Sequence, residues 1–211
     1  FDFYAPQTTV SPDGRQILVA WLQNWKTANN ETVDAPYFGQ VTLPRELRLQ
    51  DGRMLQAPVR ELAAWRQNAR GWQYGEAPSI LLSARVFDLE FELQAPTGET
   101  LGDAELDFLD DGEDRCTLAY NQEQNLLTLV RRKSDALYPE MTNCYCPLES
   151  GRTALKIRLI VDKFSVEVFV NNGQQTITAT TKANMDATSI SLSSKGETKS
   201  KLVLYDLVCE Q

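Results

Sequence analysis

The chain has 211 residues, of which 42% are hydrophobic, and its 29 acidic and 21 basic residues give a formal net charge of −8. This size and composition allow one large or two small folded domains and argue against wholesale disorder. The acidic balance disfavours nucleic acid and anionic membranes as partners, because both attract basic surfaces. No apolar run in the sequence reaches the roughly 20 residues of a membrane helix.

Histidine is absent from the sequence, which excludes Ser-His-Asp and Cys-His catalysis and most transition-metal sites. The four cysteines are Cys116, Cys144, Cys146 and Cys209. Their spacing does not match a zinc knuckle, and four in 211 residues is not the density of a disulfide scaffold. We therefore expect mostly reduced thiols and a cytoplasmic protein.

Residues 1–55 are expected to form short strands with long polar connections. The apolar run Ile17–Leu22 follows the turn sequence Pro12-Asp13-Gly14 and predicts a buried strand. Residues 37–43 are strand-like, and Asp51-Gly52 predicts a hairpin turn.

Residues 56–71 differ in pattern and predict a helical linker. Val59, Leu62 and Arg66 recur at helical spacing after a proline that suits a first helical turn. Gly71 is the expected end of this helix.

Residues 72–211 have the pattern of an antiparallel β-sandwich. Apolar and polar residues alternate in several runs, as they do in strands with one buried and one solvated face; such runs cover residues 89–94, 155–161, 166–170 and 202–208. Turn sequences separate the runs, and Asn172-Gly173 predicts a type I′ hairpin. Many short strands with this spacing favour an all-β sandwich of about 140 residues.

Residues 2–7 read Asp-Phe-Tyr-Ala-Pro-Gln and are followed by a Gly-Arg…Trp strand at residues 14–21. Residues 42–47 read Thr-Leu-Pro-Arg-Glu-Leu, and residues 161–173 read Val-Asp-Lys-Phe-Ser-Val-Glu-Val-Phe-Val-Asn-Asn-Gly. These three segments resemble parts of family 32 glycoside hydrolases, the invertases and β-fructosidases. The second is similar to that family's exit from the catalytic domain, and the third resembles a hairpin of its C-terminal sandwich.

The resemblance implies an all-β fold, with a residual portion of a five-bladed β-propeller followed by an antiparallel β-sandwich. It also implies retaining hydrolysis of β-fructofuranosides such as sucrose, sucrose 6-phosphate or fructan, without a cofactor. That reaction needs two carboxyl groups about 5 Å apart. The family carries its catalytic carboxylates in Asn-Asp-Pro-Asn-Gly, Arg-Asp-Pro and Glu-Cys stretches, and this sequence contains none of them. We therefore expect the C-terminal part of such an enzyme, inactive alone, with no catalytic or metal-binding residue of its own.

The resemblance implies substrate-binding roles for Asp2, Tyr4 and Tyr37. Tyr37 stands where the family has the tryptophan of Gly-Trp-Ala-Gly, which preserves an aromatic ring of different size. Each residue also has a structural interpretation: Asp2 as a solvated or turn carboxylate and the two tyrosines as core aromatics.

Other charged residues are expected to be structural. Arg45-Glu46 is interpreted as an ion pair or strand-end hydrogen-bonding unit, and Asp162 and Glu167 as part of a solvated strand face. The acidic run at residues 110–114 lacks EF-hand spacing and is interpreted as a solvated turn rather than a calcium loop.

An alternative function is a non-catalytic sandwich module for oligomerisation or carbohydrate binding. The apolar edges of an incomplete propeller favour self-association into a homodimer.

Overall fold

The computed structural model describes residues 2–25, 39–73, 79–132 and 142–209. These residues form sixteen strands and one short helix, so the expected all-β fold is confirmed. The strands make a four-stranded sheet and two six-stranded sheets. No helix in these ranges has the length and apolar character that crossing a membrane requires.

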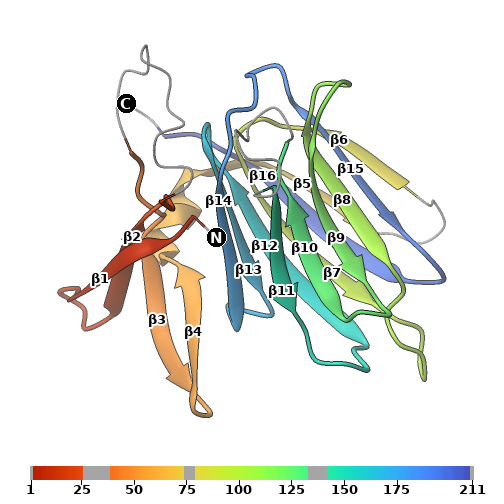
Figure 1. Ribbon diagram of the computed structural model, residues 1–211, viewed down its shortest axis with the longest axis horizontal. Coiled ribbons are helices and arrows are strands. Elements are labelled where there is room, and N and C mark those ends of the chain that lie inside the picture. Colours follow the sequence, from red (N-terminus) through yellow and green to blue (C-terminus); the bar gives the residue numbers. More distant parts are fainter. Residues whose placement is uncertain (1, 26–38, 74–78, 133–141, 210–211) are drawn as a thin grey trace.

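The N-terminal sheet is an antiparallel meander in the order β1-β2-β3-β4. Its strands are β1 (Tyr4–Val10), β2 (Gln16–Trp21), β3 (Arg45–Gln50) and β4 (Arg53–Pro58). The predicted hairpin between β3 and β4 is confirmed, with positive φ angles of 50° at Asp51 and 72° at Gly52. A four-stranded meander is the unit from which β-propellers are built, so we call this sheet the blade. Figure 1 shows the blade standing beside the larger part of the molecule.

The remaining strands form the expected sandwich of two antiparallel sheets (Figure 1). The sheet next to the blade has the order β14-β13-β12-β7-β16-β5, and the far sheet has the order β11-β10-β9-β8-β15-β6. The near sheet comprises β5 (Arg66–Gln73), β7 (Phe87–Gln94), β12 (Ala154–Val161), β13 (Ser165–Val170), β14 (Gln175–Thr180) and β16 (Lys199–Leu207). The far sheet comprises β6 (Ser79–Ser83), β8 (Ala104–Asp110), β9 (Cys116–Asn121), β10 (Leu126–Val130), β11 (Asn143–Pro147) and β15 (Ser189–Ser194).

The main core fills the space between the two six-stranded sheets, because each sheet directs its apolar alternation inward. Leu89 and Leu159 from the near sheet and Phe108 and Leu129 from the far sheet are fully buried there. A second, smaller cluster of Leu62, Ile160 and Phe169 lies on the outer side of the near sheet, with Leu43 and Leu207 packed against it. This cluster packs the blade, and the helix η1 (Arg60–Trp65) that follows it, against the near sheet of the sandwich.

The structure corrects the predicted linker helix. Only Arg60–Trp65 is helical, as the 3₁₀-helix η1, and Arg66–Gln73 is strand β5. Gly71 therefore lies inside a strand instead of ending a helix. The spacing of three residues between Val59 and Leu62 also suits a 3₁₀ turn, in which residues three apart eclipse each other.

Three further expectations are corrected in detail. Within residues 39–43, Val41 forms only an isolated bridge with Trp21 and no strand. The hairpin between β13 and β14 is confirmed, and Asn171, Asn172 and Gly173 all have positive φ. The Gly173 N–H donates to the Val170 carbonyl at 3.0 Å, so the central residues of the turn are Asn171 and Asn172, one position earlier than predicted. Strand β13 is buried on both faces from Val166 to Val170, so the face that carries Glu167 is not solvated.

Candidate functional site

Asp2 lies at the junction between the blade and the sandwich and is 0% exposed. One carboxylate oxygen accepts hydrogen bonds from the backbone N–H and hydroxyl of Thr180, at 2.8 and 2.9 Å, and from Arg131 Nη1 at 3.1 Å. The Asn24 amide donates to the other oxygen. The backbone N–H of Asp2 donates to the Thr178 carbonyl at 2.9 Å. Arg131 offsets the charge of this buried carboxylate, which couples the start of the blade to strand β14.

Tyr4 begins strand β1 at an irregular piece of backbone. The register with β2 shifts between Tyr4 and Gln7, and Ala5 has a φ of 46°, which is uncommon for a residue with a side chain. Such bulges re-aim side chains and are frequent beside functional sites. Here the rings of Tyr4 and Trp25 pack in a T-shaped arrangement, with the ring centroids 5.3 Å apart.

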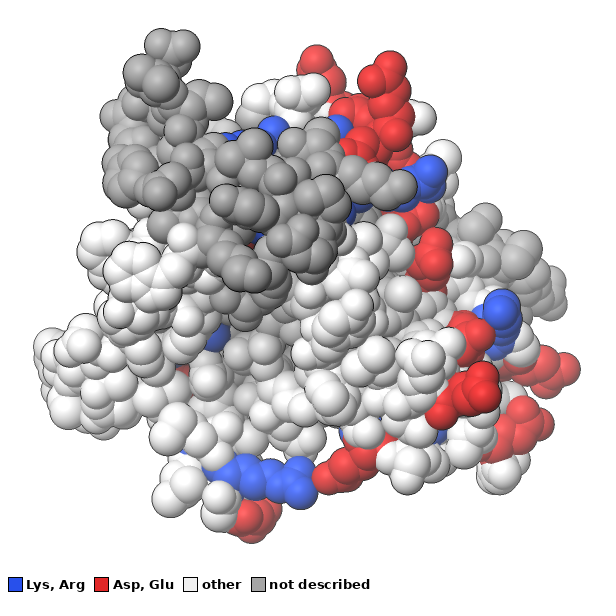
Figure 2. Space-filling model, in the orientation of Figure 1, with Lys and Arg blue, Asp and Glu red and all other residues white. Residues whose placement is uncertain are grey.

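Tyr4, Trp21 and Trp25 form an exposed aromatic patch at one end of the blade. Their exposed fractions are 42%, 49% and 74%, which is unusual for side chains of this size. Gly39 packs under it, since a Cβ there would lie 3.7 Å from the Trp21 ring. Figure 2 shows that the surface over β1 and β2 is almost free of charged side chains. Flat, exposed aromatic rings with few charges can bind the apolar face of a sugar or another apolar surface.

Sequence reasoning identified Tyr4 but not Trp21 or Trp25 as members of this patch. Tyr37, the third predicted substrate-binding residue, lies outside the described residues. The alternation along β2 could have predicted that Trp21 is exposed. Successive side chains of a strand point to opposite faces, so burial of Ala20 directs its neighbours Val19 and Trp21 to the exposed face.

Arg45 on β3 is the centre of a second junction between the blade and the sandwich. It is fully buried and donates to Glu167 Oε2 from Nη2 at 2.5 Å and from Nε at 3.1 Å. The other Glu167 oxygen accepts the backbone N–H of Leu43 at 2.6 Å. The rings of Phe3 and Phe169 each lie 5.2 Å from the guanidinium carbon. Burial raises the pKa of Glu167, and the Arg45 charge opposes that effect.

Glu46, next along β3, points to the opposite side and makes a separate network. Its carboxylate accepts hydrogen bonds from Arg15 Nη1 at 2.8 Å and from the backbone and side chain of Arg60 at 3.0 Å. The hydrogen bonds from Arg60 hold the pKa of Glu46 well below its usual range, against the effect of desolvation. Arg45 and Glu46 are therefore structural, as predicted, but they pair with distant residues and not with each other.

The acidic run at residues 110–114 is a hydrogen-bonded turn. Asp111 Oδ1 accepts the backbone N–H groups of Glu113 and Asp114 at 3.1 and 3.0 Å. Arg132 donates to Asp111 Oδ2 at 2.6 Å. These bonds lower the pKa of Asp111 to about 2, with the backbone N–H of Asp114 as the largest cause. No cluster of three metal-binding side chains occurs among the described residues.

These geometries give Asp2 a structural part at a junction and Tyr4 a place in an exposed aromatic patch. Asp2 and Tyr4 are only two positions apart in the sequence. Asp2 is nevertheless buried against residues of the sandwich, while Tyr4 faces outward. The substrate-binding roles of Asp2, Tyr4 and Tyr37 stay predictions.

Comparison with known proteins gives matches along nearly the whole chain. The family model described as the N-terminal domain of glycosyl hydrolases family 32 matches residues 1–58, and the model for the C-terminal region of that family matches residues 61–207. A probable sucrose-6-phosphate hydrolase of Vibrio cholerae is 31% identical over 197 residues, which are 91% of this chain and 33% of that protein. A sucrose-6-phosphate hydrolase of Klebsiella pneumoniae is 34% identical over 82% of this chain and 33% of its own length.

A solved structure of sucrose-6-phosphate hydrolase from Lactobacillus gasseri has the same fold. It superposes with a TM-score of 0.77 at 21% identity and covers 99% of this chain and 42% of that one. The chain thus spans about one third of the length of the curated relatives that it matches. The two family models meet between β4 and η1, where the chain leaves the blade and enters the sandwich, and the chain belongs to glycoside hydrolase family 32.

Proposed function

We propose that the chain is the C-terminal part of a retaining β-fructofuranosidase that acts on sucrose, sucrose 6-phosphate or fructan. The observation that carries this proposal is the joint match of the blade to the N-terminal family model and of the sandwich to the C-terminal one. Two similar proteins are named as sucrose-6-phosphate hydrolases, which favours a phosphorylated or free disaccharide as substrate.

The chemistry of retaining glycosidases requires a nucleophilic carboxylate and a protonated acid about 5 Å apart. In this family those groups lie in sequence stretches that the chain does not contain. Asp2 is a poor substitute, because Arg131 and Thr180 occupy one of its carboxylate oxygens and Asn24 the other. The chain alone should therefore not hydrolyse fructosides, and no cofactor is needed by the longer enzyme.

The described residues would contribute to that enzyme by binding and support. The aromatic patch with Tyr4 would lie along the sugar-binding side of the propeller. The family resemblance also implies substrate-binding roles for Asp2 and Tyr37. The junctions through Asp2–Arg131 and Arg45–Glu167 would hold the blade on the sandwich. We also propose a cytoplasmic location, in keeping with cysteines that are free thiols. Burial raises the pKa values of the Cys144 and Cys146 thiols to about 12 and 11, which suits reduced structural cysteines.

The experiment compares the purified chain with a longer protein that includes the coding region upstream of Phe1. Fructose release from sucrose and from sucrose 6-phosphate is measured for both. The longer protein should be active and the chain inactive. In the longer protein, Tyr4→Ala should raise KM for the fructoside, and Tyr4→Phe, which retains the ring, should not. Turnover by the chain alone, above a mock purification, would contradict the proposal.

Self-association is a second candidate function, favoured by the surface of the blade. All seven residues of β1 are exposed, and its outer edge has no partner strand among the described residues. An edge strand beside an exposed aromatic patch can pair with a second copy. Light scattering should then give a homodimer that Trp25→Glu converts to a monomer, whereas a monomer at all concentrations would contradict this candidate.

A further inference from the structure

The Asp2 carboxylate joins the sandwich to two segments of the blade. Its Oδ2 atom accepts the hydrogen bonds from Arg131 and Thr180 of the sandwich, and its Oδ1 atom accepts the Asn24 amide of the blade. Arg131 directly follows strand β10, and its backbone N–H donates to the Thr142 carbonyl at 2.8 Å. The cation that faces Asp2 is therefore fixed to the far sheet of the sandwich.

The two blade segments that Asp2 holds carry two rings of the aromatic patch. Tyr4 lies two positions after Asp2, and Trp25 is the neighbour of Asn24. The two rings pack against each other, although both are exposed. Exposed rings have no surrounding core to fix them, so their relative position depends on the backbone segments that carry them. The positive φ of Ala5, just after Tyr4, also persists only where surrounding contacts hold the backbone.

Arg131 decides whether Asp2 keeps this position. Both side chains are buried, and the ion pair between them is 3.1 Å long. A buried carboxylate that loses its cation is strongly destabilised, so without Arg131 the carboxylate would turn toward solvent. Asp2 would then release Asn24, and both of the segments that carry rings would lose their anchor.

Arg132, the next residue, has a similar environment but different partners. It is buried, and it donates to the Leu109 carbonyl and to Asp111 Oδ2 at 2.6 Å each. These partners belong to β8 and to the turn that follows it. Arg131 and Arg132 are thus alike in burial and in pairing with an aspartate, but the aspartate of Arg131 belongs to the blade segment and that of Arg132 to the sandwich.

We propose that Arg131 is a positioning residue for sugar binding. Through Asp2 it fixes the Tyr4 and Trp25 rings in one geometry, so the sandwich contributes to substrate affinity without touching the substrate. That the rings bind a fructoside rests on the proposed function, whereas the effect of Arg131 on the ring geometry rests on the contacts alone.

The ring geometry is tested by nuclear magnetic resonance on the 211-residue chain. The readout is the set of nuclear Overhauser contacts between the ring protons of Tyr4 and Trp25. The unaltered chain should show these contacts, and Arg131→Ala should lose them. Arg132→Ala, the matched control, should retain them.

Two further variants keep the test decisive if Arg131→Ala does not fold. Arg131→Lys should retain the ring contacts, because Nη1 alone reaches both Asp2 and Thr180 and a lysine ammonium can donate to the same two groups. Asn24→Ala leaves the ion pair in place but frees the segment with Trp25, so it should weaken the contacts. Retention of the contacts by a folded Arg131→Ala variant or by Asn24→Ala, or their loss in Arg132→Ala, would overturn the proposal.

Substrate binding is tested in the longer protein, at a temperature at which all variants are folded. Arg131→Ala should raise KM for sucrose by about three- to tenfold, the usual contribution of one aromatic contact, with kcat nearly unchanged. Arg132→Ala should leave KM unchanged. When Tyr4→Ala is already present, Arg131→Ala should add little, because Arg131 acts through the ring.

Multiplicative effects of Tyr4→Ala and Arg131→Ala on KM would show that Arg131 does not act through Tyr4, and would overturn the proposal. If the longer protein hydrolyses no fructoside, the proposed function fails. The ring contacts in the 211-residue chain then still decide whether Arg131 positions the aromatic patch.

Discussion

Replacing Gly173 by alanine should loosen the blade from the sandwich. Gly173 follows the tight turn between β13 and β14 and accepts a backbone hydrogen bond from Gln56 of strand β4 at 3.0 Å. A Cβ on Gly173 would lie 1.8 Å from the Gln56 carbonyl oxygen and 2.6 Å from its carbon. Because those atoms belong to the backbone, the two strands would have to separate.

The magnitude follows from three contributions. The φ of Gly173 is +86°, and a left-handed conformation costs an alanine about 1–2 kcal/mol. The lost hydrogen bond adds about 1 kcal/mol. Relief of the overlap costs about 1–3 kcal/mol, as for other overpacked sites. We expect Gly173→Ala to lower the free energy of unfolding by about 4 kcal/mol in total.

Gly112→Ala is the matched control, because Gly112 has a φ of +90° and nothing within 4 Å of the added Cβ. It should show the conformational cost alone, about 1–2 kcal/mol. The difference of about 3 kcal/mol corresponds to a melting temperature about 6–12 °C lower for Gly173→Ala in a protein of this size. Thermal unfolding followed by circular dichroism measures both. Equal destabilisation by the two variants would refute the contact between the hairpin and β4.

Three further predictions concern buried charges and thiols. Glu167→Ala leaves the Arg45 guanidinium buried without its carboxylate and should cost about 3–5 kcal/mol in urea unfolding. Glu46 has a lowered pKa because Arg60 donates to it, so its contribution to stability is fully present above the usual glutamate pKa and is lost progressively as the pH falls from there through the lowered value. Glu46→Gln should therefore destabilise strongly at pH 7 and less at pH 3, where part of the contribution is already lost. The Cys144 thiol, with its pKa raised to about 12 by burial, should react with a disulfide reagent at pH 8 only after denaturation.

Each of these predictions has a result that would contradict it. Glu149→Ala removes an exposed ion pair with Arg53 and should cost at most about 1 kcal/mol; an equal effect of Glu167→Ala would show that the Arg45 junction is weak. A destabilisation by Glu46→Gln that does not change with pH would assign the effect to packing. Fast reaction of Cys144 in the native protein would mean that its strand opens readily.

The local elements could largely be predicted from the sequence, because their causes are local. Alternation with a period of two identifies β7, β12 and β13, and Asp51-Gly52 identifies a hairpin. The six-residue 3₁₀-helix was predicted as a longer helix, because spacing by three residues does not separate the two helix types and β5 carries no clear alternation.

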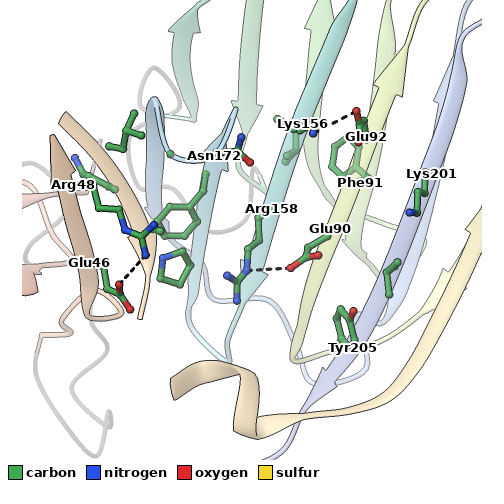
Figure 3. Close-up of a pocket in the computed structure, with 18 of the residues that line it drawn as sticks. Glu46, Arg48, Glu90, Phe91, Glu92, Lys156, Arg158, Asn172, Lys201 and Tyr205 are labelled. Carbon is green, nitrogen blue, oxygen red and sulfur yellow. Dashed lines mark hydrogen bonds and ion pairs between the residues drawn. The ribbon is translucent and has the colours of Figure 1, made fainter. Parts of the chain in front are cut away.

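The junctions between the blade and the sandwich could not be predicted, because they join residues far apart in the chain. Arg45 and Glu167 are 122 positions apart, and Asp2 and Thr180 are 178 positions apart. Alternation shows that Glu167 lies opposite the valines of β13, but it cannot show that a second sheet covers that face. The same reason applies to the open groove between the blade and the near sheet, whose lining residues come from six strands in two sheets (Figure 3).

The DNA sequence upstream of the Phe1 codon would show whether the chain is part of a working β-fructofuranosidase. We predict an open reading frame that is continuous with this chain and about twice its length, because the chain covers one third of its relatives. That frame should encode Asn-Asp-Pro-Asn-Gly, Arg-Asp-Pro and Glu-Cys stretches in this order. An in-frame stop codon close to Phe1, or a long frame without the catalytic carboxylates, would contradict the assignment to a working β-fructofuranosidase.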